Sequence, residues 1–224
     1  MKFDRYIFLD TETTGLNPLE NSLLEVGAVI VDEYEDGNKV EVCRLIMNIH
    51  PLTDAKGPLY WGPTKIDLAA LALNGYTAKS LREEALIDPK DSAATLADFL
   101  VTYVTPGSTI IACNPEFDIT FIKSFLTQNG YEAAEILGGK YADRNGAKGI
   151  KYKSVDLANL AWFIHNAGYI ELEDGKPSLD NICKALGISA YANPVLRHSA
   201  LYDTLLAMKA FFELRDIISP EEEE

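Results

Sequence analysis

Cysteine is scarce in this chain, and long apolar runs are missing. Cys43, Cys113 and Cys183 lie far apart, and an odd, scattered set fits neither a disulfide framework nor a zinc knuckle. A reducing compartment is the simplest setting for such thiols, so we expect a cytoplasmic protein. No segment reaches the length of a membrane span, and Asp10 ends the short apolar run near the N-terminus. We therefore expect neither a membrane segment nor a signal peptide.

Positive charge is also in short supply. The chain has 20 Lys and Arg residues against 34 Asp and Glu residues, for a formal net charge of −14. This balance argues against a protein that coats long nucleic acids, but it allows a small site where metal ions bridge acidic side chains to phosphates. The segment 140–153 contains five basic residues and one acid. This segment is either a guide for a nucleic-acid backbone or a solvated loop.

The apolar and turn-forming residues predict an α/β fold. Strands are expected at 5–10, 23–32, 40–49 and 108–113, with a hairpin turn at 36–38. Helices are expected at 65–73, 92–104, 117–129, 154–166, 178–186 and 199–217, with irregular segments at 51–64 and 131–153. This order predicts a mixed sheet with helices packed on it. No repeat or linker divides the chain, so we expect one domain over 1–218 and an acidic tail at 219–224.

Two acids end the first apolar run, in YIFLDTETTGL. Asp10 and Glu12 are two residues apart, so their side chains share one face if the strand continues through Glu12. Two carboxylates this close repel each other unless one is protonated or a cation lies between them. Mg²⁺ and Mn²⁺ prefer such oxygen ligands. The alternative is that Asp10 ends the strand and Glu12 lies in a solvated turn.

A third acid follows another short strand, in IIACNPEFDITFI. Asp118 lies at the start of the expected helix 117–129, where its charge also suits the positive end of the helix dipole. The pattern therefore leaves two readings for Asp118, one as a site residue and one as a helix-stabilising acid.

A histidine and a fourth acid begin the last helix, in RHSALYDTLLAMKAF. His198 and Asp203 are five residues apart, which places them about 140° apart around a regular helix. They would not share a face if both were helical. We therefore expect His198 in the segment that enters the helix, beside the site. A solvated or capping histidine is the alternative.

Together these segments resemble the three motifs of the DEDDh exonucleases, a family that includes the proofreading subunit of bacterial replicative polymerase, ribonuclease T and the TREX enzymes. The signature is Asp-x-Glu, then Asp, then His-x4-Asp. This chain matches it in order with Asp10, Glu12, Asp118, His198 and Asp203. Weaker likeness lies between the motifs, as in LLEVGAVIVD and PSLDNICKALGI, so the resemblance covers residues 5 to about 212.

The resemblance implies a ribonuclease H-like fold with a central mixed five-stranded sheet flanked by helices. It implies that the four acids hold two divalent metal ions, Mg²⁺ or Mn²⁺, about 4 Å apart around the scissile phosphate. His198 would be the general base that activates water, a role suited to a pKa near neutrality. The expected activity is the stepwise release of 5′-mononucleotides from a 3′ end.

The resemblance also marks a nucleotide pocket. Thr13, Thr14, Gly15 and Leu16 match the stretch that contacts the terminal nucleotide, although an ordinary turn is the alternative. Asn114 and Phe117 match pocket positions, and Phe117 is equally consistent with the core. The chain departs from its relatives at Cys113 and Asn74, which stand where relatives often have histidine, and at Pro115-Glu116. These departures bear on substrate preference.

An acidic protein with one small basic segment fits a single-stranded or frayed 3′ end of DNA or RNA better than long duplex. A second hypothesis is a catalytically inactive nucleic-acid-binding or scaffold module with the same fold. A third is a proofreading partner of a polymerase. A homodimer is compatible with each of them, and the resemblance does not choose between DNA and RNA.

Overall fold

The computed structural model describes residues 2–49, 65–77, 81, 87–137, 152–188 and 198–219. The proline-containing segment 51–64, residues 140–151 of the basic segment and the tail at 220–224 lie outside these ranges, so the expectations made for them stay predictions. Within the described ranges, no helix is both long and apolar enough to cross a membrane.

A five-stranded mixed sheet forms the centre of the molecule, in the order β3-β2-β1-β4-β5. Strands β1 and β2 pair antiparallel, as do β2 and β3, while β4 runs parallel to both β1 and β5. The strands are β1 (Phe3–Thr13), β2 (Leu23–Tyr34), β3 (Lys39–Asn48), β4 (Thr109–Ala112) and β5 (Lys153–Asp156). The expected α/β, ribonuclease H-like fold with a mixed five-stranded sheet is confirmed.

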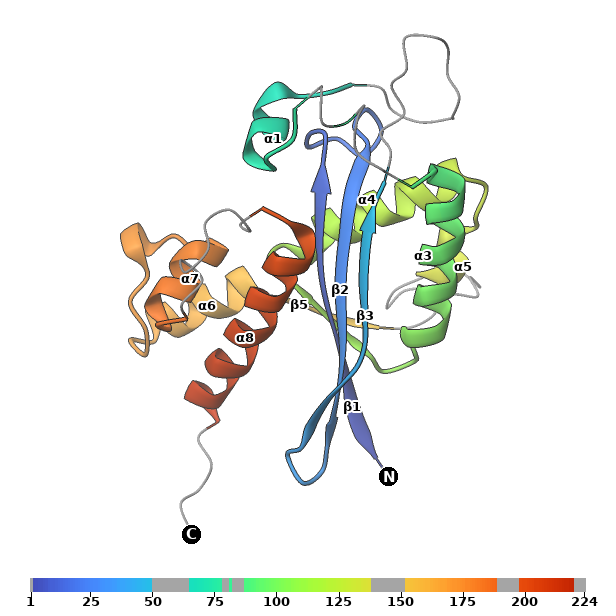
Figure 1. The fold of residues 1–224 in the computed structure, drawn as a ribbon. Coiled ribbons are helices and arrows are strands. Elements are labelled where there is room, and N and C mark those ends of the chain that lie inside the picture. Colours follow the sequence, from blue (N-terminus) through green and yellow to red (C-terminus); the bar gives the residue numbers. More distant parts are fainter. Residues whose placement is uncertain are drawn as a thin grey trace.

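Helices cover both faces of this sheet (Figure 1). One layer contains α3 (Pro89–Tyr103), α4 (Pro115–Gln128) and α5 (Ala133–Ile136), and the other contains α6 (Leu157–Asn166), α7 (Leu179–Ala185) and α8 (Ala200–Ile218). The short helix α1 (Leu68–Leu73) lies at the end of the sheet where β1 finishes and α8 begins. A single 3₁₀ turn, Glu173–Gly175, connects α6 to α7.

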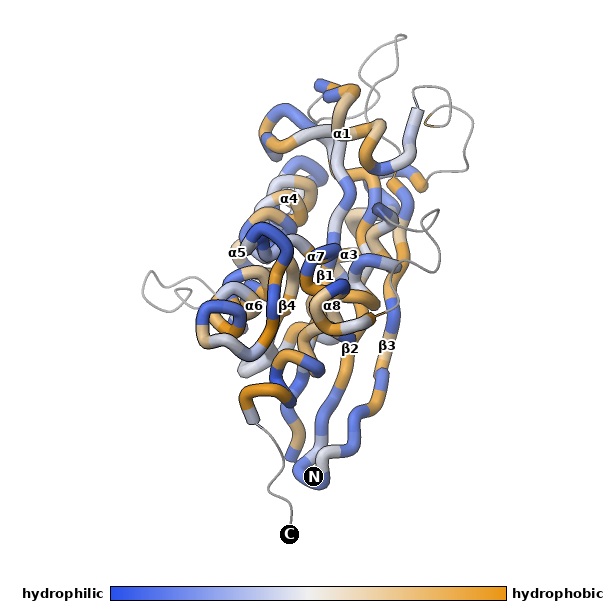
Figure 2. The backbone as a smooth tube through the Cα atoms, turned by 90° about the vertical axis from the view of Figure 1, so that its left-hand side faces the viewer, coloured by the Kyte–Doolittle hydropathy of each residue, from blue (hydrophilic) through white to orange (hydrophobic). Residues whose placement is uncertain are grey.

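Alternation along the strands separates two cores. Ile7 and Leu9 of β1 pack with α3 and α4, while Phe8 between them packs with α6 and α8. Because successive strand residues point to opposite faces, one strand supplies both cores. Figure 2 shows the resulting mixture of hydrophobic and hydrophilic residues along the strands, with a hydrophilic end at the β2–β3 hairpin. The central strands are therefore buried on both faces.

Two expectations about secondary structure were wrong. Residues 154–156 belong to β5 and not to a helix, because they pair in parallel with β4, for example Ile111 with Val155. The helix begins one residue after this strand, and Asp156 caps it by accepting hydrogen bonds from Ala158 N and Asn159 N. Residues 133–136, expected to be irregular, form α5. Four-residue elements carry too little periodicity to be recognised from sequence.

Candidate active site

The end of β1 places Asp10 and Glu12 on the α8 face of the sheet. The strand continues through Thr13, as the shared-face argument required. Tyr6 lies an even number of residues before Asp10 and Glu12 in the strand. Its ring lies 5.4 Å from that of Phe211 on α8. Because Asp10 and Glu12 continue this parity, their side chains leave the sheet on the same side.

The start of α8 completes a compact group with Glu12. One ligand atom from each of Glu12, His198 and Asp203 lies within 4.8 Å of the other two. Asp203 is in the first turn of the helix, while His198 precedes the capping residue Ser199. The expectation that His198 lies in the segment entering the helix is confirmed. Its φ of 62° is a left-handed conformation that few side chains adopt, and it occurs where the chain turns into α8.

Asp118 contacts strand β1 from the opposite helical layer. It lies in the first turn of α4, is 3% exposed, and accepts a 2.7 Å hydrogen bond at Oδ1 from Thr11 Oγ1. Thr11 stands between Asp10 and Glu12 and has the other parity, so it faces the α4 side. Burial raises the pKa of Asp118 to about 7, and the Thr11 hydroxyl opposes this rise by stabilising the charged form. Near neutral pH this carboxyl therefore holds a proton or needs a cation.

The pKa of the Cys113 thiol reflects the negative charge of nearby carboxylates. Burial, followed by the charges of Asp156, Asp10 and Asp118, raises the pKa of its thiol to about 12. Three carboxylates are therefore close enough to disfavour another negative charge. Without a bound metal the thiol stays protonated at physiological pH, so Cys113 is not suited to nucleophilic attack.

The donor set fits a hard divalent cation. Carboxylate oxygens are the preferred ligands of Mg²⁺ and Mn²⁺, and Glu12, Asp118 and Asp203 are all buried. Buried acids that share one region repel each other, and a bound cation removes that repulsion. The compact group brings together Glu12, Asp203 and His198, whereas Asp10 and Asp118 are not members of it. Asp118 is instead tied to the same strand through Thr11.

The turn after β1 is held by an internal hydrogen-bond network. The fully buried Thr14 side chain donates to Lys65 O and accepts from Ser22 N. Gly15 leaves room for Asn21, whose amide would lie 2.5 Å from a Cβ at that position. The Thr14 hydroxyl thus has a structural role here, and its contact with substrate stays a prediction.

The other pocket residues expected in this turn differ in accessibility. Thr13 is buried and donates from Oγ1 to Gly15 O at 2.6 Å, while Leu16 is 82% exposed. Asn74, at the end of α1, donates to Thr13 O. An exposed leucine held by a rigid turn is consistent with an apolar contact to a nucleotide base, and that contact stays a prediction.

Asn114 and Phe117 flank the start of α4. Asn114 is exposed and has a φ of 78°, so the backbone turns sharply there between β4 and the helix. Phe117 is half-buried and packs against the sheet core, with its ring centroid 4.8 Å from that of Phe121. The core role of Phe117 is therefore present, and its nucleotide contact stays a prediction.

Sequence reasoning missed Glu25, Gly27 and Asp156. Glu25 is a buried acid in the middle of an apolar strand, where an ionised group is expensive, and that signal was available in LLEVGAVIVD. Gly27 lies in the same strand, where an isolated glycine indicates a close backbone approach. Asp156 was not recognised as a strand end and helix cap, because residues 154–166 were interpreted as one helix.

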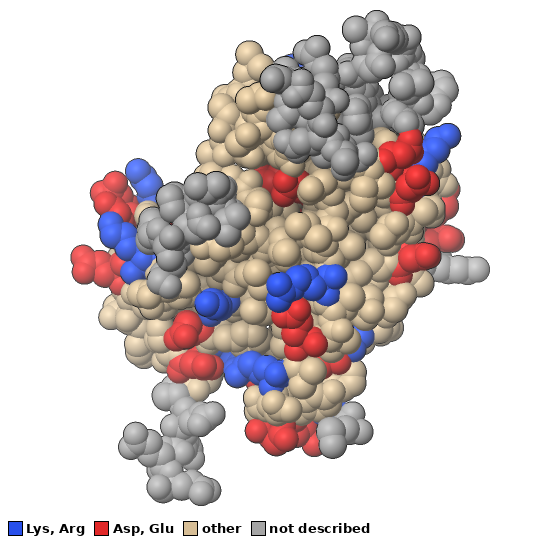
Figure 3. Space-filling model, in the orientation of Figure 1, with Lys and Arg blue, Asp and Glu red and all other residues tan. Residues whose placement is uncertain are grey.

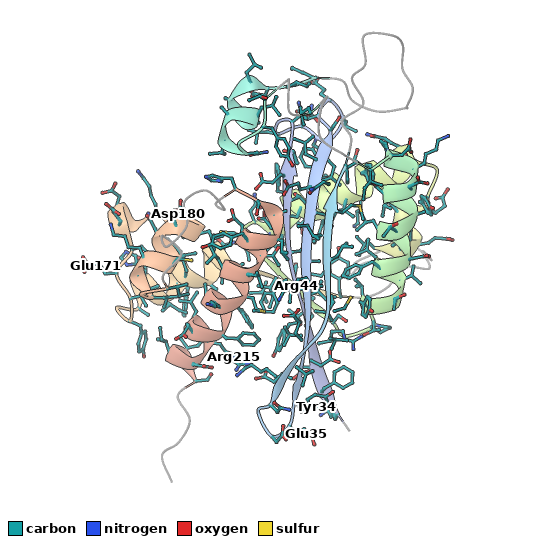
Figure 4. The ribbon with its side chains drawn as sticks, viewed as in Figure 1. Tyr34, Glu35, Arg44, Glu171, Asp180 and Arg215 are labelled. Atoms are coloured by element: carbon teal, nitrogen blue, oxygen red, sulfur yellow. The ribbon has the colours of Figure 1, made fainter. Side chains whose placement is uncertain are left out.

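Charge on the surface is mixed. On the face shown in Figure 3, the Lys, Arg, Asp and Glu side chains of the described residues lie in small groups of both signs. Ion pairs among the described residues include Arg5 with Asp32 and Arg215 with Glu33. Figure 4 shows Arg215 towards the end of α8 that lies away from α1. The described part of this face presents no continuous basic surface for a long nucleic acid.

The fold and the acidic group together define a ribonuclease H-like domain with a candidate metal site at the end of β1. No protein-family model matches the chain, and no curated protein matches it by sequence. Solved structures do match it.

The solved structures that it resembles include several of exonuclease I. The zinc-bound complex of Escherichia coli exonuclease I with single-stranded DNA aligns with a TM-score of 0.70 and 18% identity, covering 98% of this chain and 42% of that one. A product-bound exonuclease I structure aligns with a TM-score of 0.69 and 16% identity, covering 96% and 44%. The E. coli enzyme in complex with a dA16 oligonucleotide aligns with a TM-score of 0.65 and 18% identity, covering 95% and 41%. This chain thus spans less than half of these neighbours, and identities this low establish a shared fold.

Proposed function

We propose that this chain is a metal-dependent 3′–5′ exonuclease that removes 5′-mononucleotides from single-stranded or frayed 3′ ends. The observation that carries the proposal is the compact group of Glu12, His198 and Asp203, in which two elements distant in sequence place ligand atoms within 4.8 Å of one another. Its position on a fold shared with exonuclease I, which has been solved with single-stranded oligonucleotides, supports a nucleic-acid substrate.

The four acids would hold the metal ions. Asp10, Glu12, Asp118 and Asp203 would supply the carboxylate oxygens, which suits two Mg²⁺ or Mn²⁺ ions. When bound, such ions would neutralise the carboxylates and stabilise the charge that develops on the scissile phosphate. The burial of Asp118 supports this assignment, because a bound cation would offset the cost of ionising a buried carboxylate.

His198 would act as the general base. Its imidazole would take a proton from the attacking water at one ring nitrogen while the water oxygen bonds to phosphorus and the bond to the 3′ oxygen breaks. The left-handed backbone at His198 supports this role, because the ring stands before the helix and beside the acids. The compact group also allows His198 to be a metal ligand, and the Mn²⁺ affinity of a His198→Ala variant separates the two roles, because only a ligand's loss weakens metal binding.

Substrate contacts would come from the turn after β1 and the start of α4. The exposed Leu16 would contact a base, and Asn114 would contribute polar contacts at the pocket edge. Thr13, Thr14, Gly15 and Phe117 would shape the pocket. We further propose that residues 1–218 act as one domain in the cytoplasm, with the basic segment 140–153 guiding the strand. The three widely spaced cysteines, Cys43, Cys113 and Cys183, suit a reducing setting.

An end-labelled gel assay tests the proposal. A 5′-labelled single-stranded DNA and an RNA of the same sequence are incubated with the wild type, Asp10→Ala and Asp203→Asn, in Mn²⁺ or in EDTA. Glu35→Gln is the matched control, because Glu35 is an exposed acid on the β2–β3 hairpin, at the opposite end of the sheet (Figure 4).

A ladder that shortens from the 3′ end is expected with the wild type and with Glu35→Gln, and it should disappear in EDTA and in both site variants. The faster substrate identifies the preferred sugar. If the wild type binds Mn²⁺ but shortens neither polymer at micromolar enzyme, the nuclease proposal is wrong. The inactive scaffold or polymerase-partner hypothesis would then take its place.

A further inference from the structure

Strand β2 carries an acid and a glycine directly beside the two acids of β1. In the antiparallel register Glu12 pairs with Glu25, and Asp10 pairs with Gly27. Residues directly opposite each other in such a pair point to the same face. Glu25 is therefore a buried carboxylate next to Glu12 on the α8 face of the sheet, although it belongs to none of the three sequence motifs.

The start of α8 is seated on this acid and glycine. A Cβ at Gly27 would lie 2.3 Å from the backbone carbon of Ala200, so only glycine permits this approach. Ala200 N donates a 3.0 Å hydrogen bond to Glu25 Oε2, and Thr204 Oγ1 donates a 3.1 Å hydrogen bond to Gly27 O. Ala200 lies two residues after His198 and three before Asp203, so these contacts fix the turn that carries both.

The second oxygen of Glu25 holds another part of the site. The Tyr76 hydroxyl donates to Glu25 Oε1. Tyr76 follows α1, and Asn74 at the end of that helix donates to Thr13 O in the turn after β1. One carboxylate thus joins the proposed nucleotide-binding turn and α1 on one side to the start of α8 on the other.

We propose that Glu25, held by Tyr76, is a positioning residue that keeps His198 and Asp203 against Glu12. The proposal rests on the proposed function. Loss of the carboxylate would leave the buried Ala200 N–H without its acceptor, and the helix start would shift or take up water. Groups that orient metal ligands in this way typically contribute about 10- to 100-fold to metal affinity or activity.

Four variants test the proposal. Glu25→Ala removes both hydrogen bonds, Glu25→Gln retains an acceptor for Ala200 N, and Tyr76→Phe removes only the hydroxyl. Glu33→Gln is the matched control. Glu33 also joins β2 to α8, through Arg215 at 2.5 Å, but at the other end of the helix. All four are compared for kcat, KM on single-stranded oligonucleotide, the pH profile of kcat, Mn²⁺ affinity by calorimetry, and melting temperature.

We expect Glu25→Ala to lower kcat by roughly 10- to 100-fold with a smaller change in KM, and to weaken Mn²⁺ binding by about tenfold or more. Tyr76→Phe should lower both by several-fold, and Glu25→Gln should recover most of the loss. Glu33→Gln should lower the melting temperature while kcat and Mn²⁺ affinity stay unchanged. This pattern separates positioning from general stabilisation, because a purely structural role would make Glu25→Ala resemble Glu33→Gln, with a lower melting temperature and unchanged kcat and Mn²⁺ affinity.

A folded Tyr76→Phe protein that retains wild-type kcat, pH profile and Mn²⁺ affinity would overturn the proposal, even if Glu25→Ala does not fold. The proposal would also be overturned if Glu33→Gln lowered kcat and Mn²⁺ affinity as much as Glu25→Ala does. If the wild type binds Mn²⁺ without cleaving DNA or RNA, the proposed function fails, and the Mn²⁺ affinities still decide the role of Glu25.

Discussion

Replacing Asp118 by Asn should stabilise the metal-free protein at alkaline pH. Asp118 is 3% exposed, and burial raises its pKa from an ordinary 3.8 to about 7. Without metal, the ionised carboxylate at pH 8 is a buried charge that lacks a cation. Asn has nearly the same shape and can still accept the Thr11 hydrogen bond at Oδ1. The variant therefore removes the charge and retains the contact.

The sign and size of the effect follow from proton linkage. Between pH 4 and 7 the native protein binds the Asp118 proton more tightly than the unfolded chain does, so the free energy of unfolding falls as pH rises through this window. The interval from 3.8 to about 7 corresponds to about 4 kcal/mol, at about 1.4 kcal/mol per pH unit. Local relaxation and water entry reduce the penalty, so we expect a difference of about 2–4 kcal/mol at pH 8.

Thermal unfolding in EDTA measures this difference. For a domain of this size about 1 kcal/mol corresponds to roughly 2–4 °C, so Asp118→Asn should melt about 4–16 °C above the wild type at pH 8 and at nearly the same temperature at pH 4. Asp32→Asn is the contrasting control, because Asp32 accepts two 2.7 Å hydrogen bonds from Arg5 and its loss should destabilise. If Asp118→Asn melts below the wild type at pH 8 in EDTA, burial does not dominate the energetics of Asp118.

Three further predictions concern the same end of the sheet. Mn²⁺ at about 100 times its dissociation constant should stabilise the wild type by about 2.7 kcal/mol and Asp203→Asn by much less, measured by melting with and without the ion. Gly27→Ala should destabilise the protein by about 1–3 kcal/mol or more in urea unfolding, because its Cβ would meet the Ala200 backbone; an unchanged midpoint would contradict the packing described. Cys113 should resist iodoacetamide at pH 8 in the native protein and react after denaturation, as followed by mass spectrometry; rapid native modification would refute the raised thiol pKa.

The candidate site could be read from sequence where local spacing decides the geometry. The interval between Asp10 and Glu12 implies a shared face once they lie in a strand, and the structure extends β1 through both. The interval between His198 and Asp203 excludes a shared helical face, and His198 does precede the helix. Strand β5 was missed because its four residues are strand-forming only through their pairing with β4.

Sequence alone determined the longer elements and the identity of the acids, because periodicity and residue type are properties of short segments. Only the tertiary structure decided which groups meet. The parity of β1 sends Glu12 to the α8 layer and Thr11 to the α4 layer, so Asp203 and Asp118 arrive from opposite sides of the sheet. The same is true of Glu25 and Gly27, whose place beside Glu12 and Asp10 follows from strand register. Register and layer packing join residues far apart in the chain, and no local pattern in the sequence records them.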